Sequence, residues 1–281
     1  MILSAIPASL LVLAVRAVLP GQDGEFPADL GRWYVTAPPE ELSDDWLAAQ
    51  MDIEHEWVVT PGKTVPQVGI RGLQQENPPR LPFEIKPGPA KEGLAGRRVT
   101  TKVDDGWLVG FDAGEFGAGL WWFSPDGRDR YKISDDHVIE FFSVASSVIA
   151  LTGMEHGGVS EGNVIRFSRN DEKRWVTDRL MDLGERPHAA IKNADGTLLV
   201  ATHTRLIKVD LLAKSIHVIV KEAFWEGMYP NSIATSSSGT IFIGMRHGVA
   251  RIDKTRGVYN LSWMLPSKEF ADRFRYKEGF N

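Results

Sequence analysis

An apolar residue recurs at almost constant spacing through the second half of this 281-residue chain. Its copies are Phe123, Phe167, Val209 and Ile252, which lie 44, 42 and 43 residues apart. A period in this range is typical of architectures in which each unit cannot bury its own apolar face and must stack on its neighbours. The spacing therefore restricts the chain to a repeat fold more strongly than any other feature of the sequence.

Two of the repeated units align without a gap. Residues 187–200 match residues 230–243, and each unit contains a strand, a tight turn at Gly196 or Gly239, and a second strand of mainly apolar residues. A third strand ends near the recurring apolar residue, and a polar fourth strand follows it. Four strands per unit predict a β-propeller blade. We expect an all-β propeller of five or six blades, with four regular blades over residues 95–266.

The remaining segments are predicted to be less regular. Residues 21–94 are expected to form an irregular N-terminal segment with one or two degenerate blades and a short helix near residue 45, capped by Ser43. Seven of the sixteen prolines lie in residues 61–89, which indicates an irregular wrap over the body of the protein. The tail, residues 267–281, is predicted to end in a short packed helix.

Composition excludes several classes of partner and site. The formal net charge is −5 and the charges are interspersed, so nucleic acid and anionic membrane surfaces are not expected partners. The absence of cysteine excludes disulfides, thiolate zinc sites and cysteine nucleophiles. We expect the protein to act as a monomer.

The first twenty residues resemble a targeting segment. Residues 2–15 are almost wholly apolar, and Val15-Arg16-Ala17 has the small-residue pattern that a signal peptidase accepts. We therefore predict that residues 1–20 are a cleaved signal peptide. This would place the protein in the periplasm or outside the cell, with no stable membrane insertion. The alternative is a buried N-terminal segment.

The repeated units are similar to blades of known propeller families. Pro230–Ala234 with Ser238–Gly244, and Arg186–His188 with Asp195–Leu198, resemble blades of the NHL-repeat, streptogramin-lyase and gluconolactonase-like propellers. The resemblance covers about 170 residues and its motifs are mostly structural. It therefore implies the fold and does not assign a function.

The gluconolactonase-like family also implies a possible metal site. Its Pro-Asn motif supplies a metal ligand, which corresponds to Asn231 here, and His188 and Glu115 would be candidate partners for one Ca²⁺ or Mg²⁺. Arg98 occupies the equivalent position two blades earlier and is a poor neighbour for a cation. No matching acidic pair is evident either, so the chain departs from the family pattern.

Blade geometry predicts where chemistry gathers. The start of each innermost strand and the loop between the second and third strands lie at the same face of the central channel, which we call the channel rim. Five of the seven histidines fall on it, and loops held by a rigid scaffold commonly carry binding sites. The predicted rim residues are Arg98, Glu115, His137, His156, His188, His203, Asn231, Arg246 and His247.

Three functions remain open from the sequence. We favour a non-catalytic protein that binds a protein or a polar small molecule at the rim without a cofactor; an inhibitor or immunity-type envelope protein is one version. A metal-dependent lactonase or lyase with His188 as base is the second. The third is a structural scaffold in which His188 is a hydrogen-bonded polar plug of the channel.

Two further enzyme classes find no support in the sequence. The chain has no Gly-x-Ser-x-Gly elbow, which argues against a serine hydrolase of the α/β type. The glycines of residues 114–119 precede a strand instead of a helix, which argues against a dinucleotide-binding loop.

Overall fold

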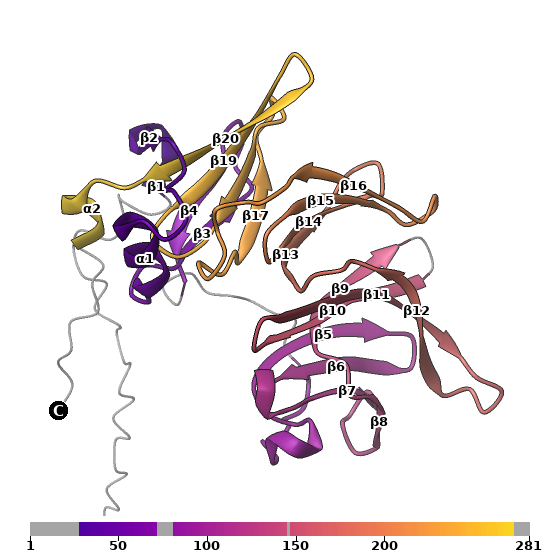
Figure 1. Ribbon diagram of the computed structural model, residues 1–281. Helices are drawn as coiled ribbons and strands as arrows, with labels where there is room; N and C mark the ends of the chain where they lie inside the picture. The colour runs from indigo at the N-terminus through magenta and orange to yellow at the C-terminus, as the bar shows by residue number, and fades with distance from the viewer. Residues whose placement is uncertain (1–27, 72–80, 145–146, 273–281) are drawn as a thin grey trace, which may run out of the picture.

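The computed structural model describes residues 28–71, 81–144 and 147–272. These residues form five antiparallel sheets, two short α-helices and connecting loops (Figure 1). The predicted signal peptide, residues 1–20, lies outside the described residues. No helix among the described residues has the length and apolar character needed to cross a membrane.

Four of the sheets contain a four-stranded meander with consecutive strands paired, which is the topology of a propeller blade; three consist of the meander alone and one has a fifth strand. The propeller expected from the 43-residue spacing is thus confirmed. Blade one consists of β5 (Arg97–Val103), β6 (Gly106–Asp112), β7 (Ala118–Phe123) and β8 (Arg130–Ser134). Blade two consists of β9 (Val138–Val144), β10 (Ser147–His156), β11 (Val159–Arg169) and β12 (Trp175–Asp182). Blade three consists of β13 (Pro187–Lys192), β14 (Leu198–Thr202), β15 (Leu206–Asp210) and β16 (Ser215–Val220), and blade four of β17 (Ser232–Thr235), β18 (Ile241–Gly244), β19 (Val249–Thr255) and β20 (Val258–Leu265).

The N-terminal part of the chain forms a degenerate blade and completes the last regular one. Strands β1 (Ala28–Asp29), β4 (Gln67–Ile70) and β3 (Trp57–Thr60) make a three-stranded sheet. Strand β2 (Tyr34–Thr36) pairs instead with β20 and becomes the fifth strand of blade four. Residues 34–36 are therefore hydrogen-bonded to the last blade.

The proline-rich segment, residues 61–89, is more regular than expected in one place because it contains β4. Its later part does wrap over the body of the protein as predicted. Phe83 stacks on Phe123 of blade one with ring centroids 5.6 Å apart, and Ile85 is buried in the same cluster.

The sheets follow one another around an arc, because the innermost strand of each touches the innermost strand of the next. The contacts run from β5 to β9, β13 and β17, and then to β3 of the N-terminal sheet. Figure 1 shows this succession from the magenta first blade to the yellow last one.

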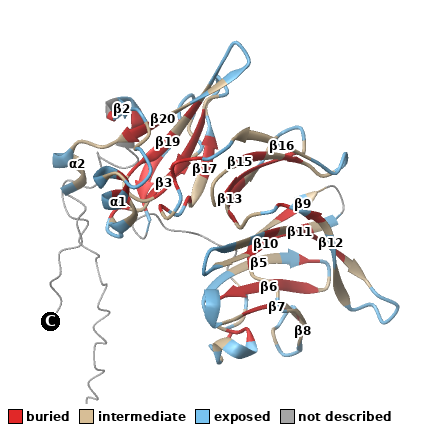
Figure 2. Cartoon of the chain, viewed as in Figure 1, coloured by how far each residue is buried: buried red, intermediate tan, exposed pale blue. Residues whose placement is uncertain are grey.

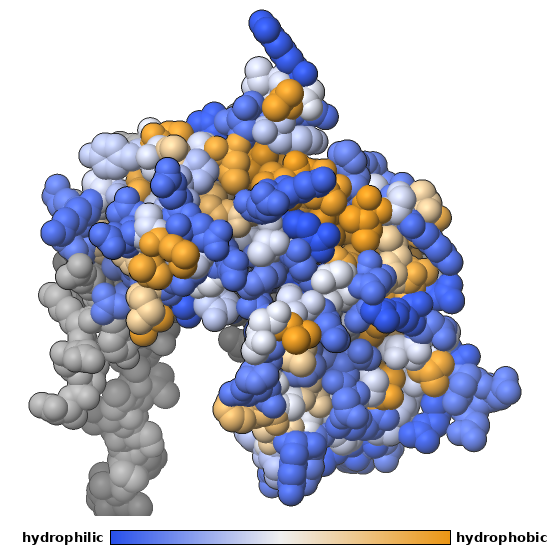
Figure 3. Space-filling view, viewed as in Figure 1, coloured by the Kyte–Doolittle hydropathy of each residue, from blue (hydrophilic) through white to orange (hydrophobic). Residues whose placement is uncertain are grey.

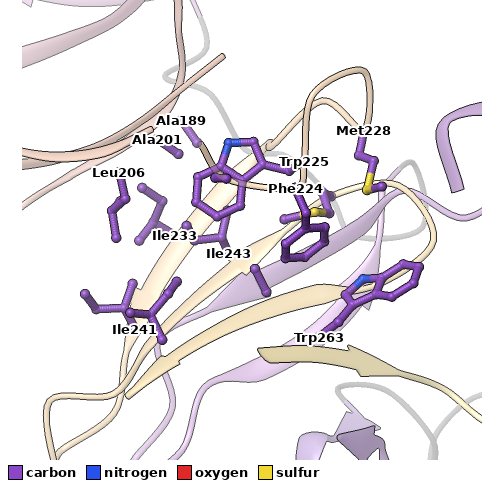
Figure 4. Close-up of a cluster of buried hydrophobic side chains, with 14 of the residues drawn as sticks. Ala189, Ala201, Leu206, Phe224, Trp225, Met228, Ile233, Ile241, Ile243 and Trp263 are labelled. Carbon is purple, nitrogen blue, oxygen red and sulfur yellow. The ribbon is translucent and has the colours of Figure 1, made fainter. Parts of the chain in front are cut away.

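Three of the recurring apolar residues lie between neighbouring blades, and the fourth, Phe123, packs against the segment at residues 81–94. Their exposed fractions are 2% for Phe123, 5% for Phe167, 0% for Val209 and 1% for Ile252. Each belongs to a different buried cluster. Figure 2 shows the buried residues concentrated along the inner strands, and Figure 4 shows the cluster between blades three and four. Burial between blades therefore explains the 43-residue spacing.

Both predicted helices are present. Helix α1 (Asp44–Met51) begins after Ser43, whose side-chain oxygen accepts a hydrogen bond from the Trp46 backbone N–H at 3.2 Å. The Trp46 indole donates to the Phe224 carbonyl at 2.9 Å, which attaches the helix to the segment between blades three and four. Helix α2 (Lys268–Asp272) follows the last blade.

The repeat positions should carry more stability than exposed positions on the same strand. Replacing Phe167, which is 5% exposed, with alanine should lower the free energy of unfolding by about 3–5 kcal/mol because it leaves a cavity. The matched control is Val159→Ala on the same strand, where the side chain is 53% exposed and the expected change is about 0.5 kcal/mol or less. Urea denaturation measures both, and similar losses would contradict a core role for the repeat.

Candidate binding site at the channel rim

A β-hairpin of blade two projects the central acidic residue of the rim. Strands β10 and β11 continue through residues 153–163 to a turn at Gly157-Gly158, so the connection between the second and third strands of this blade is a hairpin. Glu155 is paired with Ser160 in this extension. A strand pair holds Glu155 more rigidly than a loop would.

Two glycines let the neighbouring blade approach this hairpin. Gly153 and Gly162 face each other across the strand pair. A Cβ atom at either position would collide with Pro187, and one at Gly162 would also collide with the Glu185 carbonyl oxygen. The absence of side chains therefore brings the start of β13, with His188, beside Glu155.

Glu155 is the centre of a cluster with two histidines. Its Oε2 lies 3.3 Å from Nε2 of His188 and 3.2 Å from Nδ1 of His203. The two imidazole rings are near parallel, with centroids 6.2 Å apart. The His188 side chain is only 7% exposed, and Glu155 Oε2 is buried without a well-aligned hydrogen bond. The three side chains are thus close together but imperfectly bonded to one another.

The environment fixes the protonation of this cluster. Burial lowers the pKa of His188 below its usual value, against the opposing effect of the Glu155 carboxylate. The His188 side chain in turn lowers the pKa of Glu155, which burial alone would raise. At neutral pH the cluster therefore combines a carboxylate with a neutral His188 imidazole.

On the blade-one side, the cluster continues into a second group of charges. Arg186 donates from Nη2 to Asp112 Oδ2 at 3.1 Å, and His137 Nδ1 lies 2.9 Å from Asp112 Oδ1. Burial would raise the pKa of Asp112, but its bonds to His137 and Gly114 and the nearby Arg186 charge hold it below its usual value. The Nε of Arg186 is buried without a hydrogen-bond partner.

An arginine and a glutamate of the innermost strands lie next to this group. Arg97 donates from Nη2 to the Ile139 carbonyl at 2.9 Å. Burial raises the pKa of Glu140 to about 7, and the positive charge of Arg97 opposes this rise. Glu140 is therefore an acid that titrates near neutral pH.

On the blade-four side, aromatic and basic side chains adjoin His188. Tyr229 contacts the His188 ring edge to face at 6.1 Å, and the guanidinium of Arg246 lies 4.4 Å from the centre of the Tyr229 ring. Nδ1 of His247 is 2.7 Å from Asp52. Tyr229 and His247 have φ of 52° and 67°, a region that non-glycine residues seldom adopt outside constrained sites.

The structure groups most of the predicted rim residues around Glu155 and its neighbours. His188 and His203 contact Glu155 directly, His137 belongs to the Arg186–Asp112 group, and Arg246 contacts Tyr229. Asn231 lies two residues after Tyr229 in the chain. Its Oδ1 accepts a hydrogen bond from Ser232, and its Nδ2 is buried without a partner.

Four predicted residues stand apart from this group, and one of them, His247, pairs with Asp52 at 2.7 Å. Arg98 lines a shallow pocket with residues 81–85, while its neighbour Arg97 joins the charged group. Glu115 and His156 pair with each other at 2.8 Å, with side chains 46% and 61% exposed. Glu115 therefore does not join His188, and the metal set of Asn231, His188 and Glu115 implied by the family resemblance is not assembled around Glu115.

The repeat could have identified two of the residues that were missed. Arg186 and Tyr229 occupy the same position in the two aligned units, two residues before His188 and Asn231. Glu226 and Asp52 lie in segments without a repeat partner, so no comparable signal marks them in the sequence.

A pocket opens beside the rim near His203. Its volume is about 370 Å³, and its charged lining residues are three glutamates, Glu41, Glu222 and Glu226. Trp46 and Phe224 contribute aromatic surface. Glu226 Oε1 is also 3.6 Å from His203 Nε2, so the pocket and the Glu155 cluster share a border. Figure 3 shows a largely hydrophilic face, with apolar side chains gathered where blades three and four meet.

Comparisons with known proteins add likenesses of fold. No protein-family model matches the chain, and no curated protein is significantly similar to it in sequence. Among solved structures, an auxiliary nutrient binding protein from Bacteroides thetaiotaomicron aligns at 13% identity with a TM-score of 0.37, over 56% of this chain and 38% of that one. A virginiamycin B lyase from Staphylococcus aureus aligns at 13% with a TM-score of 0.40, over 62% and 56%.

A propeller in a nidogen–laminin complex aligns at 11% identity with a TM-score of 0.37, over 58% of this chain and 60% of that one. The chain thus spans less than two thirds of the length of each of these three structures. The lyase belongs to a class of propeller that the sequence resembles. At these identities and TM-scores, the likenesses carry no argument about what this chain binds or catalyses.

The raised pKa of Glu140 predicts a pH dependence of stability. The unfolded chain ionises this residue near pH 4.5, while the folded chain does so at about 7. The stability that protonated Glu140 contributes to the fold is therefore fully present below pH 4.5 and is lost as the pH rises through 7. Glu140→Gln should match the wild type near pH 4.5 and melt about 2–8 °C higher at pH 8. Thermal melts at both pH values test this, with the exposed Glu172→Gln as control; equal melting temperatures at pH 8 would contradict it.

Proposed function

We propose that this protein is an exported, non-catalytic β-propeller that binds a polar ligand at the channel rim. One observation carries the proposal: Glu155 Oε2, Arg186 Nε and Asn231 Nδ2 are all buried, and none of them makes a well-aligned hydrogen bond within the protein. Buried polar groups are nearly always bonded, and leaving one unsatisfied costs about 1–3 kcal/mol. A bound ligand with complementary donors and acceptors would recover that free energy.

The pocket beside His203 suggests the charge of the ligand. Its volume of about 370 Å³ suits a small molecule or one side chain of a partner, and its charged lining residues are all acidic. A cationic group would be attracted by Glu222 and Glu226 and could contact the aromatic faces of Trp46 and Phe224. We therefore propose a ligand with an amine or guanidinium group, either a small amine or a lysine or arginine side chain of a protein.

A metal-dependent lyase or lactonase is the second candidate. The observation that favours it is the cluster of Glu155 with two imidazoles, which can bind a divalent ion. An enzyme of this kind would convert its ligand, whereas the binding protein would release it unchanged. Incubation of protein with ligand, followed by mass spectrometry of the ligand, separates the two.

The cation preference predicts the effect of two substitutions. Agmatine and short lysine-containing peptides should bind the full chain in calorimetric titration. Glu222→Gln combined with Glu226→Gln should weaken binding at least about tenfold, because a tenfold change corresponds to roughly 1.4 kcal/mol. Glu172→Gln removes one negative charge from an exposed turn and should leave binding unchanged. Absence of binding, or equal affinity in both variants, would contradict the proposal.

The export part of the proposal has its own measurement. Intact-mass spectrometry of the protein purified from its native cells should give the mass of a chain that begins within a few residues of Ala17. Recovery of the chain with its first residues intact, in the cytoplasmic fraction, would contradict export.

A further inference from the structure

We propose that Glu155, His188 and His203 bind one divalent transition-metal ion of the Zn²⁺ or Mn²⁺ type. The inference deepens the proposed binding role. It rests on that role only for the statement that the ion faces the polar ligand bound at the rim. The three donor atoms come from two adjacent blades, and all lie within 4.8 Å of one another.

The spacing of the donors fits a metal better than direct hydrogen bonds. Ions of this type bind imidazole nitrogen and carboxylate oxygen at about 2.0–2.2 Å, so neighbouring ligands of a tetrahedral site are about 3.4 Å apart. The Glu155 oxygen is 3.3 Å from His188 Nε2 and 3.2 Å from His203 Nδ1. Hydrogen bonds between charged groups are shorter, at about 2.7–2.9 Å. The same oxygen is buried and has no well-aligned hydrogen bond.

The surroundings also suit coordination. His203 has its other ring nitrogen, Nε2, 3.6 Å from Glu226, and a carboxylate behind a metal-bound histidine commonly orients the ring. The positive charge of Arg186 is the main opposing feature, but Arg186 is paired with Asp112 at 3.1 Å. Glu155 and Glu226 therefore leave the immediate environment favourable to a cation.

The ligand types indicate which ions fit. Two imidazoles and one carboxylate suit zinc, manganese and related ions, whereas Ca²⁺ and Mg²⁺ prefer oxygen ligands. Three protein ligands also leave a coordination position open. Since the cluster lies on the rim, the open position would be available to water or to an oxygen donor of the bound ligand.

Metal titration tests the inference without knowledge of the organic ligand. Tag-free full chain, treated with EDTA and dialysed, is titrated with ZnCl₂ and with MnCl₂ in a calorimeter. We expect saturation at one ion per chain for at least one of the metals. Glu155→Gln, His188→Gln and His203→Gln should each weaken binding at least about tenfold. His156→Gln is the matched control, because His156 adjoins Glu155 in sequence but is exposed and paired with Glu115.

Several outcomes would overturn the metal site. They are an absence of saturable heat with both metals, an affinity unchanged in the three cluster variants, or an equal loss in His156→Gln. Circular dichroism confirms the fold of each variant. Because His188 is buried, the partly exposed His203 provides the deciding substitution if His188→Gln does not fold. Binding of Co²⁺ with visible ligand-field bands, lost in His203→Gln, supports the site independently.

The same samples separate this inference from the proposed function. If agmatine binds in the presence of EDTA and neither metal binds, the metal site is wrong and the binding role stands. If a metal binds at the cluster and no cationic probe binds, the proposed cation-binding role is wrong and the metal site stands.

Discussion

Apolar packing between neighbouring sheets is the constraint on which the rest of this structure depends. Each regular blade buries its faces against neighbouring sheets or, on the outer side of blade one, against residues 81–94. Val209, for example, is 0% exposed in the cluster between blades two and three. A blade alone would leave those faces in water, so the units are stable only together. This packing sets the register of every blade, and the register decides which residues reach the channel rim.

The rim is the opposite case, since its side chains are ionisable and partly buried. Each of the five predicted rim histidines lies within hydrogen-bond distance of a carboxylate, or close to it, from another segment. Such groups lose hydration when the fold forms, and pairing returns part of that loss. At Glu155 the lost hydration is only partly compensated, because its buried oxygen faces two imidazoles without a well-aligned hydrogen bond. That imbalance makes this place, and not the exposed pair of Glu115 and His156, the centre of the site.

The sequence could predict the features that depend on regular spacing. The strands that end near Phe123, Phe167, Val209 and Ile252, the helix capped by Ser43 and the rim positions of His188 and His203 all follow from local patterns. Arg98 shows the limit of this reasoning. The register of the innermost strand differs by one residue from the expected one, so Arg97 lies in the charged group in place of Arg98. The hairpin at residues 153–163 does not follow from local patterns, because alternation does not reveal that Gly153 and Gly162 must admit Pro187. Glu226 and Asp52 depend on contacts between distant segments that no repeat encodes.

The central claim is that the rim around Glu155 is the binding centre of the molecule. Anomalous diffraction at the zinc edge, on crystals of the full chain grown with ZnCl₂, tests it most directly. The account predicts one strong peak at about 2.0–2.2 Å from His188 Nε2, His203 Nδ1 and a Glu155 oxygen. It would be contradicted by peaks only at exposed residues such as His156, with Glu155, His188 and His203 bonded directly to one another.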